Sequence, residues 1–344
     1  MATPKNTAAW LESEKAYPLV VKEAPYPTLT TPNSLIIKTT AIAFNPVDYA
    51  LQSHAMLPLP YPWILGCDAA GTVVAAAPAA AARYPPGTRV AGLCPGFDAK
   101  DPAGCAFQAF VRLEAPLVVA LPPNVADAQA VALPLALGTA AAGLFGEDQL
   151  RLRLPGRGGR GAVLVWGAAT SVGSCAVQLA VSAGYEVVAT AGRANAEYAR
   201  RLGAVAVFDY KAEGVVEEVV KAFEGREFVG VYDAASTGGA IEACLEIAAR
   251  VKTDGRRFVS SVRWLPEGLK VPEGVETAWM WGTSPKDTNV GPAIFQEFLP
   301  AALEDGRFIP APEPLVVGEG LESVQKALDV LKEGVSAKKV VVTL

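Results

Sequence analysis

The stretch VLVWGAATSVGSCAVQLA, residues 163–180, decides the fold of this chain. Its opening run VLVW is short and wholly apolar, which is typical of a strand buried on both faces of a parallel sheet. Gly167 then begins a tight turn, and Gly173 lies in the first turn of an expected helix. A glycine turn between such a strand and a helix lets backbone amides approach a pyrophosphate at the positive end of the helix.

The glycine spacing in this stretch differs from the strict G-x-G-x-x-G pattern. Gly167 and Gly173 are six positions apart, and Thr170 stands where the middle glycine would be. An ordinary strand–helix turn is therefore an alternative interpretation. The strand before the turn and the helix after it favour a dinucleotide-binding βαβ unit.

Strand-like and helix-like segments alternate from this stretch onward. Strands are expected at 186–191, 204–210, 228–234 and 256–262, with helices between them at 195–204, 214–225 and 238–250. The alternation predicts a Rossmann fold of the α/β class, a parallel, doubly wound sheet with right-handed crossovers.

The first part of the chain has a different pattern. Short apolar runs split by Pro, Gly and Asn are typical of β-strands and turns, and they occur over 16–45, 70–76, 88–93 and 106–120. They predict an irregular, barrel-like β domain. After helices expected around 290–304 and 319–333, a last strand KKVVVTL is expected to return to this domain. The predicted division is 1–125 and 300–344 for the β domain, and 126–299 for the Rossmann domain.

Composition limits the classes of function. Apolar residues make up 51% of the 344, enough for two buried cores, and the net charge of −5 argues against nucleic acid as a partner. The N-terminus has no apolar core of signal-peptide length, and the apolar stretches 132–145 and 162–169 are short and broken by Gly. Five scattered cysteines without a C-x-x-C pair suit a reducing compartment, so we expect a cytoplasmic protein outside the membrane.

The end of the second Rossmann strand bears on the choice of nicotinamide. NAD-preferring sites place an acidic residue there, but VVATA is followed by Gly192 and Arg193. The Arg193 guanidinium suits a ribose 2′-phosphate, and Tyr210 at the end of the third strand is a second candidate. We therefore expect NADP(H). The alternative for Arg193 is a solvated residue at a helix start.

Three motifs carry a resemblance to a known family: NPVD (45–48), PYPWILGCDAAGTVV (60–74) and VLVWGAATSVG (163–173). With them, the chain resembles the medium-chain dehydrogenase/reductase superfamily along nearly its full length. The closest branch is that of the zinc-independent quinone oxidoreductases and enoyl reductases, including fungal trans-acting polyketide enoyl reductases. The resemblance implies that the β domain is GroES-like.

The resemblance also supplies a test for catalytic zinc, which needs about three protein ligands. It implies ligands at the positions of Asn45 and Cys67 and a cysteine within 133–145, where this chain has none. The single histidine, His54, excludes a site of several histidines. The structural zinc lobe is also missing, because 94–105 holds only Cys94 and Cys105. We predict no metal and regard Cys67 as a small buried residue.

Without a Lewis acid, hydride addition to an activated C=C is less demanding than reduction of a ketone, since the charge spreads onto an oxygen that a hydrogen bond can stabilise. Asn45 is the candidate for contacting the nicotinamide or the substrate carbonyl. Asp48 is the next catalytic candidate, and a turn-stabilising role is its alternative. The proton donor stays open among Tyr49, His54, Tyr61 and solvent. Ala50 replaces the lysine that trans-acting enoyl reductases tend to have, which weakens transfer of their active-site details.

Further cofactor contacts are expected from the glycine turn, the strand ends and the family positions. They are Pro46, Thr139, Gly167, Ala169, Thr170, Ser171, Val172, Gly173, Gly192, Arg193, Asn195, Tyr210, Ala234 and Lys338. In the family, the Trp264–Trp281 region lines the substrate pocket, although core packing or a dimer edge is an equal alternative here. The arginine-rich loop 151–160 suits an anionic carrier or, on the simpler interpretation, a solvated loop.

The sequence therefore predicts an NADPH-dependent, zinc-independent reductase of enones, enoyl groups or quinones. A trans-acting enoyl reductase that serves a polyketide synthase and acts on a carrier-bound acyl chain is the alternative. A non-catalytic NADPH-binding protein is the second alternative. Both a monomer and a homodimer are compatible with the resemblance.

Overall fold

A computed structural model describes residues 4–235 and 238–344 and divides the chain into two compact units. Unit 1 comprises the chain up to Leu135 together with Phe295–Leu344, and unit 2 is Ala136–Ile294. The divisions therefore fall at 135/136 and 294/295, where the sequence had placed them at 125/126 and 299/300.

Unit 1 contains a small and a large sheet. The small sheet has the order β2 (Val20–Ala24), β1 (Asn6–Leu11), β4 (Trp63–Ile64). The large sheet has the order β15 (Glu313–Glu319), β16 (Lys338–Thr343), β3 (Ser34–Ala43), β5 (Asp68–Ala76), β6 (Arg89–Leu93), β8 (Val118–Ala120), and β7 (Phe110–Glu114) pairs with β3. Strand β3 is buried along its length except at Lys38 and Thr40, in keeping with its apolar runs SLII and AIA.

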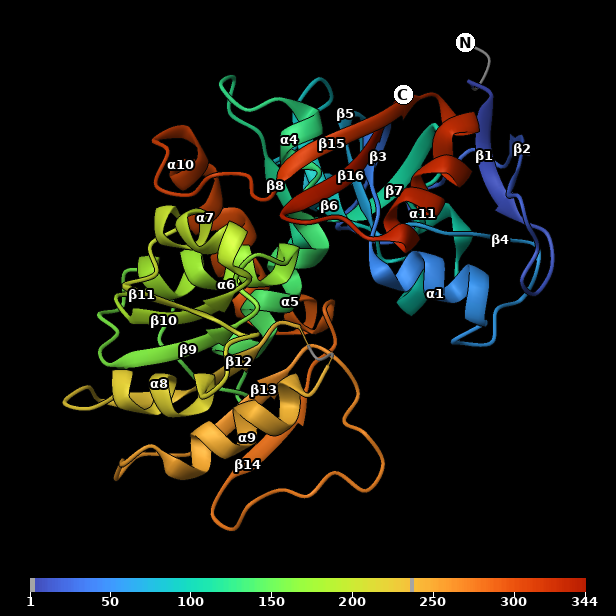
Figure 1. Ribbon diagram of the computed structural model, residues 1–344. Coiled ribbons are helices and arrows are strands. Elements are labelled where there is room, and N and C mark those ends of the chain that lie inside the picture. Colours follow the sequence, from blue (N-terminus) through green and yellow to red (C-terminus); the bar gives the residue numbers. More distant parts are fainter. Residues whose placement is uncertain (1–3, 236–237) are drawn as a thin grey trace. The chain divides into compact units, whose positions relative to one another are not determined.

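The last strand returns to the first part of the chain, as expected. β16 runs antiparallel to β3, with Val341 opposite Ala43, and parallel to β15. In Figure 1 the red strands β15 and β16 lie beside the blue β3. This pairing brings residues near 340 next to residues near 43, and so builds part of the site described below.

Short helices lie between the strands of unit 1. They are α1 (Pro46–His54), α2 (Pro78–Ala81), α3 (Gly96–Ala99), α4 (Asp127–Ala130), α10 (Leu299–Glu304) and α11 (Val324–Glu333). Helices α10 and α11 fall within the ranges 290–304 and 319–333, where the sequence predicted helices. Helix α5 (Pro134–Phe145) follows α4. The 19-residue span Asp127–Phe145 is apolar and long enough to cross a membrane by composition alone, but 83% of it is buried inside the protein, as in a core helix.

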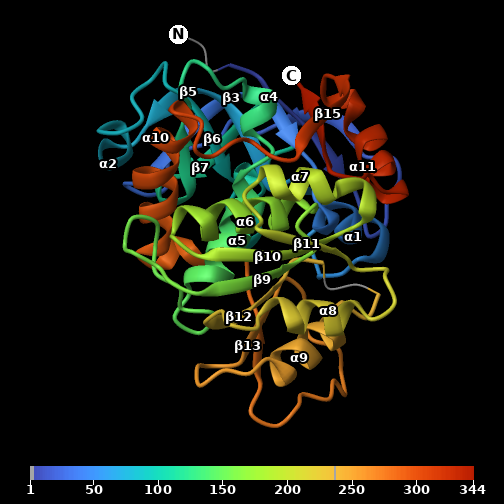
Figure 2. The same ribbon diagram turned by 60° about the vertical axis from the view of Figure 1, so that its left-hand side comes forward.

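Unit 2 is the doubly wound parallel sheet that the sequence predicted. Its order is β11 (Ala206–Asp209), β10 (Glu186–Ala191), β9 (Ala162–Trp166), β12 (Phe228–Asp233), β13 (Phe258–Ser261), β14 (Glu276–Trp279). Helices α6 (Ser171–Ser182) and α7 (Ala196–Arg201) cover one face, and α8 (Val215–Ala222) and α9 (Ala240–Arg250) the other, as Figure 2 shows. The sequence had not anticipated β14. The strand order reverses direction between β9 and β12, the place where such sheets bind ligands.

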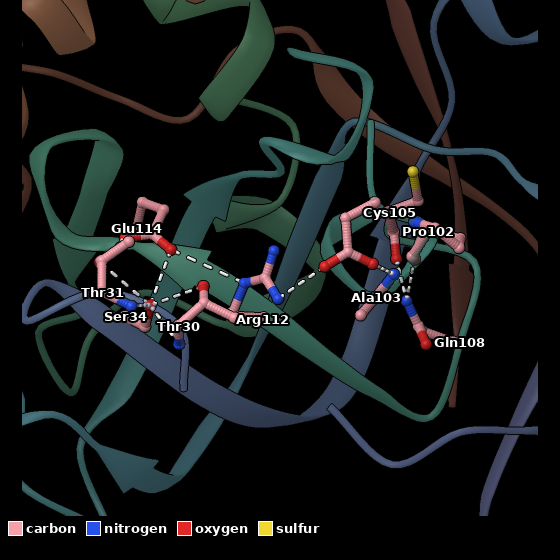
Figure 3. A network of polar contacts seen from close by, with 10 residues as sticks. Thr30, Thr31, Ser34, Pro102, Ala103, Cys105, Gln108, Arg112 and Glu114 are labelled. Atoms are coloured by element: carbon pink, nitrogen blue, oxygen red, sulfur yellow. Dashed lines mark hydrogen bonds and ion pairs between the residues drawn. The ribbon is translucent and has the colours of Figure 1, made fainter. Parts of the chain in front are cut away.

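A buried arginine ties three segments of unit 1 together (Figure 3). The Arg112 side chain is 4% exposed and forms ion pairs with Asp101 at 2.8 Å and Glu114 at 3.7 Å. Glu114 in turn accepts hydrogen bonds from Thr31 and Ser34. The 101–108 turn held in this way donates backbone hydrogen bonds to Leu65 and Gly66, directly before Cys67. Arg112 therefore supports the segment that leads into the polar centre of unit 1.

Candidate active site and cofactor turn

The NPVD motif begins helix α1. Pro46 occupies the first helical position, where a missing N–H costs nothing, and Asn45 is the residue before it. The Asp48 carboxylate accepts the Asn45 backbone N–H at 2.8 Å. The turn-stabilising role considered for Asp48 is therefore present in the structure, and the Asn45 side chain is left to make other contacts.

Asn45, Asp68 and Lys339 form a buried polar centre in unit 1. Asn45 Nδ2 donates to Asp68 Oδ2 at 2.8 Å, and Lys339 Nζ donates to Asn45 Oδ1 at 2.6 Å. Lys339 Nζ also lies 3.0 Å from Asp68 Oδ2, with side-chain exposures of 2% and 0%. The backbone N–H of Leu135 donates to the other oxygen of Asp68. Each charge is thus paired and hydrogen-bonded, the condition for a buried ion pair to persist.

Asp48 and Cys67 lie beside this centre. Burial, more than any charge, raises the pKa of Asp48 to about 7, and the Asp68 carboxylate raises it further, while the Asn45 and Gly66 amides and Lys339 oppose the rise. The Cys67 thiol faces Asp48 Oδ1 at 3.8 Å, and burial raises the pKa of Cys67 well above its usual value. Cys67 is a buried thiol, as the sequence predicted.

These donors do not fit a catalytic zinc. The Lys339 ammonium already holds the Asn45 and Asp68 oxygens, which leaves Cys67 as the one soft donor where a catalytic zinc needs about three protein ligands. Within residues 4–235 and 238–344, the His, Cys, Asp and Glu side chains form no group of three or more that could hold a metal ion.

The other catalytic candidates lie on or near α1. Tyr49 is half-buried and its ring meets the edge of the exposed His54 ring at 6.3 Å between centroids. Tyr61 is also half-buried. In the described part of the chain, the hydrogen bonds of the Asn45–Asp68–Lys339 centre involve none of these three side chains. The structure therefore does not select a proton donor among them.

The predicted glycine turn is built as a close contact between β9 and α6. A Cβ on Gly173 would lie 2.2 Å from the Gly167 carbonyl oxygen, so only glycine fits there. Gly167 has a φ of 87°, and a Cβ on it would meet Ala235 at 3.0 Å. Thr170 is the N-cap of α6, and its hydroxyl accepts the Gly173 N–H at 2.9 Å. The threonine at the middle-glycine position therefore has a capping role.

The exposed side of this turn consists of predicted cofactor residues. Ala169, Thr170, Ser171 and Val172 are only partly buried, at the N-terminus of a 12-residue helix. The Ala234 carbonyl oxygen accepts a 3.3 Å hydrogen bond from Thr170 Oγ1, which joins the end of β12 to the turn. This arrangement fits the pyrophosphate of a dinucleotide.

The residues proposed for the 2′-phosphate come together at the ends of β10 and β11. A Cβ on Gly192 would lie 3.7 Å from the Tyr210 ring, and Arg193 next to it is exposed. The Lys211 ammonium lies 5.6 Å from the Tyr210 ring centroid. Lys211 directly follows the FDY strand end and was not among the residues predicted from the sequence. Asn195 precedes α7 without capping it through its side chain.

Two further predicted cofactor residues have defined surroundings. Thr139 lies in α5 and is 8% exposed, and its carbonyl oxygen accepts the buried Tyr232 hydroxyl at 2.9 Å. Lys338 points away from the polar centre and pairs with Glu313 at 2.5 Å, with its side chain 41% exposed. The neighbouring Lys339 is the buried lysine. Because successive residues of a strand face opposite sides, the KKVVV pattern contained the signal that one of the two lysines is buried.

The fold and these sites define a medium-chain dehydrogenase/reductase, and the chain belongs to that superfamily, whose similar members include proteins named dehydrogenases and trans-enoyl reductases. Residues 31–123 match the alcohol dehydrogenase GroES-like domain, and residues 171–271 match the zinc-binding dehydrogenase family. The chain is therefore an oxidoreductase, and membership implies a nicotinamide cofactor.

Individual relatives match over the whole chain. A zinc-binding alcohol dehydrogenase domain-containing protein of Emericella nidulans, cipB, is 43% identical and the match covers 100% of this chain and 99% of the relative. The trans-enoyl reductase himH of Aspergillus japonicus is 34% identical over 100% of this chain and 99% of the relative. The crystal structure of an alcohol dehydrogenase superfamily protein from Novosphingobium aromaticivorans superposes with a TM-score of 0.79 at 25% identity, covering 98% of this chain and 99% of the other.

Proposed function

We propose that this protein is an NADPH-dependent, zinc-independent reductase of an activated C=C, in an enone or enoyl thioester, or of a quinone. The observation that carries the proposal is the buried centre in which a lysine ammonium and a carboxylate hold the Asn45 carboxamide. It offers a fixed hydrogen-bond donor where a zinc enzyme would offer a Lewis acid.

The chemistry follows from charge development. A bound nicotinamide cofactor would supply the hydride. When the β-carbon of the substrate accepts it, negative charge moves through the conjugated system to the carbonyl oxygen. A carboxamide N–H aimed at that oxygen stabilises the charge, and a preorganised donor of this kind typically contributes about 10²–10³-fold in rate. A proton then reaches the α-carbon from Tyr49, His54, Tyr61 or water.

The preference for NADPH rests on Gly192, Arg193 and Lys211. No acid stands at the end of β10 to hold a ribose 2′-hydroxyl, and the Arg193 and Lys211 side chains follow the two adjacent strand ends. A guanidinium and an ammonium suit a phosphate dianion.

Steady-state turnover tests this proposal. Purified protein is assayed with enones, enoyl thioesters and quinones, with NADPH and NADH in parallel. The expected result is turnover of at least one class with a clear preference for NADPH. Arg193→Ala and Lys211→Met should each raise the KM for NADPH roughly tenfold or more, the loss of a charge-assisted contact, while KM for NADH changes little. An equal loss for both cofactors removes these residues from the phosphate site.

A trans-acting enoyl reductase is the second candidate, favoured by the relative named a trans-enoyl reductase. In that role the substrate is an acyl chain held on a carrier rather than a free molecule. Activity on carrier-bound enoyl chains, with little on the matching free thioesters, would establish this candidate over the first.

We further propose a cytoplasmic enzyme, monomer or homodimer, in keeping with five free cysteines that are all buried.

A further inference from the structure

Lys339 is a buried cation that the reaction proposed above does not use directly. Its ammonium donates a hydrogen bond to the side-chain oxygen Oδ1 of Asn45 and pairs with the carboxylate of Asp68, and its side chain is 2% exposed. The three residues come from β16, the start of α1 and the start of β5. A buried lysine at the meeting point of three elements needs an explanation beyond strand packing, since exposure is the normal state of lysine.

The chemistry of its neighbours decides which way the Asn45 carboxamide points. A lysine ammonium has only donors, so it must face the amide oxygen, and a carboxylate has only acceptors, so it must face the amide nitrogen. Nδ2 carries two hydrogens, and the bond to Asp68 uses one of them. The second N–H is therefore the polar group that Asn45 can offer to a ligand, and it fits a carbonyl oxygen.

We propose that Lys339 is the positioning residue of this site: with Asp68 it locks the Asn45 carboxamide in the orientation that presents N–H rather than C=O. The ligand that this donor takes is a carbonyl oxygen, that of the substrate or of the nicotinamide carboxamide. The expected effect on kcat rests on the proposed function, whereas the orientation of the Asn45 carboxamide does not depend on it.

The surrounding charges explain why a cation is required in this place. The Asp68 carboxylate lies in the centre, and Asp48, which lies beside it, would add a second negative charge on ionisation. Lys339 supplies the opposing positive charge. Without Lys339, the Asn45 carboxamide has no cation to fix its oxygen. If the carboxamide then turned by 180°, its oxygen would face the carbonyl oxygen of the ligand, and the two oxygens would repel each other.

The kinetic test must separate orientation from simple charge balance. Lys339→Met leaves Asp68 unpaired and endangers folding, so the informative variant is the neutral pair Asp68→Asn with Lys339→Met. Lys326→Met is the matched control, because Lys326 lies in the same unit, is exposed and donates from its ammonium to the Val317 carbonyl oxygen. We expect the neutral pair to fold, with kcat lowered roughly 10–100-fold, as for supporting residues behind a first contact. An unchanged KM for NADPH then assigns the donor to the substrate carbonyl, and a raised KM assigns it to the nicotinamide carboxamide. The control keeps the wild-type kcat. A neutral pair with wild-type kcat overturns the proposal.

A second measurement does not depend on turnover. Hydrogen exchange of the Asn45 side-chain amide, followed by NMR on protein with ¹⁵N-labelled asparagine, should be slow in the wild type and in Lys326→Met. In the neutral pair it should be at least tenfold faster, because the Asn45 carboxamide has lost the ammonium that fixes its oxygen, and a neutral amide oxygen replaces the stronger carboxylate acceptor of its Nδ2. Unchanged protection overturns the proposal. If the wild-type protein reduces none of the substrates, the proposed function fails, and the exchange measurement still decides the role of Lys339.

Discussion

Asp48 is the residue of the NPVD motif whose ionisation the fold changes most. Its side chain is fully buried, and burial raises its pKa from 3.8 to about 7. Between these two pH values the folded protein keeps the proton that the unfolded chain has released. The stability contributed by protonated Asp48 is therefore complete below about pH 4 and is lost as the pH rises through 7.

Asp48→Asn should remove this pH dependence while its amide oxygen still accepts the Asn45 N–H. We expect the difference in unfolding free energy, wild type minus variant, to fall by a few kcal/mol (~2–4) between pH 4.5 and pH 8. Urea unfolding at several pH values measures it. Asp254→Asn, at an exposed loop position, is the control. A difference that stays constant with pH would contradict the prediction.

At the scale of elements, the turn between β9 and α6 depends on Gly173. In Gly173→Ala the new methyl group meets a backbone oxygen, which cannot swing away, so the strand and helix must separate. We expect a loss of about 2–3 kcal/mol of stability, the upper range for overpacking, and at least tenfold weaker binding of NADPH, measured by fluorescence titration. Gly192→Ala is the comparison for stability: its methyl group would meet only Tyr210, at an ordinary 3.7 Å, and unfolding free energy should change by less than about 0.5 kcal/mol.

The ion pairs of Arg112 with Asp101 and Glu114 lead to a second prediction at the scale of elements. Arg112→Met leaves the 101–108 turn and Glu114 without their cation. We expect a loss of roughly 2 kcal/mol, below the ~3–5 kcal/mol of a fully buried pair, because Asp101 is 37% exposed. Thermal unfolding at low and high salt measures it. Arg307→Met, which removes an exposed ion pair with Asp305, should cost less than about 1 kcal/mol. Equal losses would show that Arg112 is no better supported than a surface arginine.

The strands that the sequence predicted well are those in which apolar residues dominate. AVLVW, EVVATA and FVGVYD are such segments, and each forms a central strand of unit 2. The segment ETAW has no such run, because β14 is a half-exposed edge strand, and it was missed. Asn45 and Asp48 were found through a local motif. Lys339 was not, because its partners are almost 300 positions away, and only the register of β16 on β3 turns it inward.

At the scale of the whole molecule, the chain matches a family whose name indicates zinc binding, but its side chains at the expected ligand positions do not suit zinc. We expect purified protein to contain far less than one zinc per chain, and turnover to survive dialysis against EDTA, because Cys67 is the one soft ligand among the three positions where zinc enzymes of the family have theirs. Elemental analysis and assays before and after dialysis measure this. One zinc per chain whose removal abolishes turnover would refute it.

The discontinuous build of unit 1 has a consequence for the order of synthesis. Asn45, Asp48 and Asp68 leave the ribosome early, all of unit 2 follows, and Lys339 comes only with β16. Until then the Asp68 carboxylate has no ammonium to pair with, so its burial carries a larger desolvation cost. We expect a chain stopped before β16 to have a complete glycine turn and a less stable unit 1.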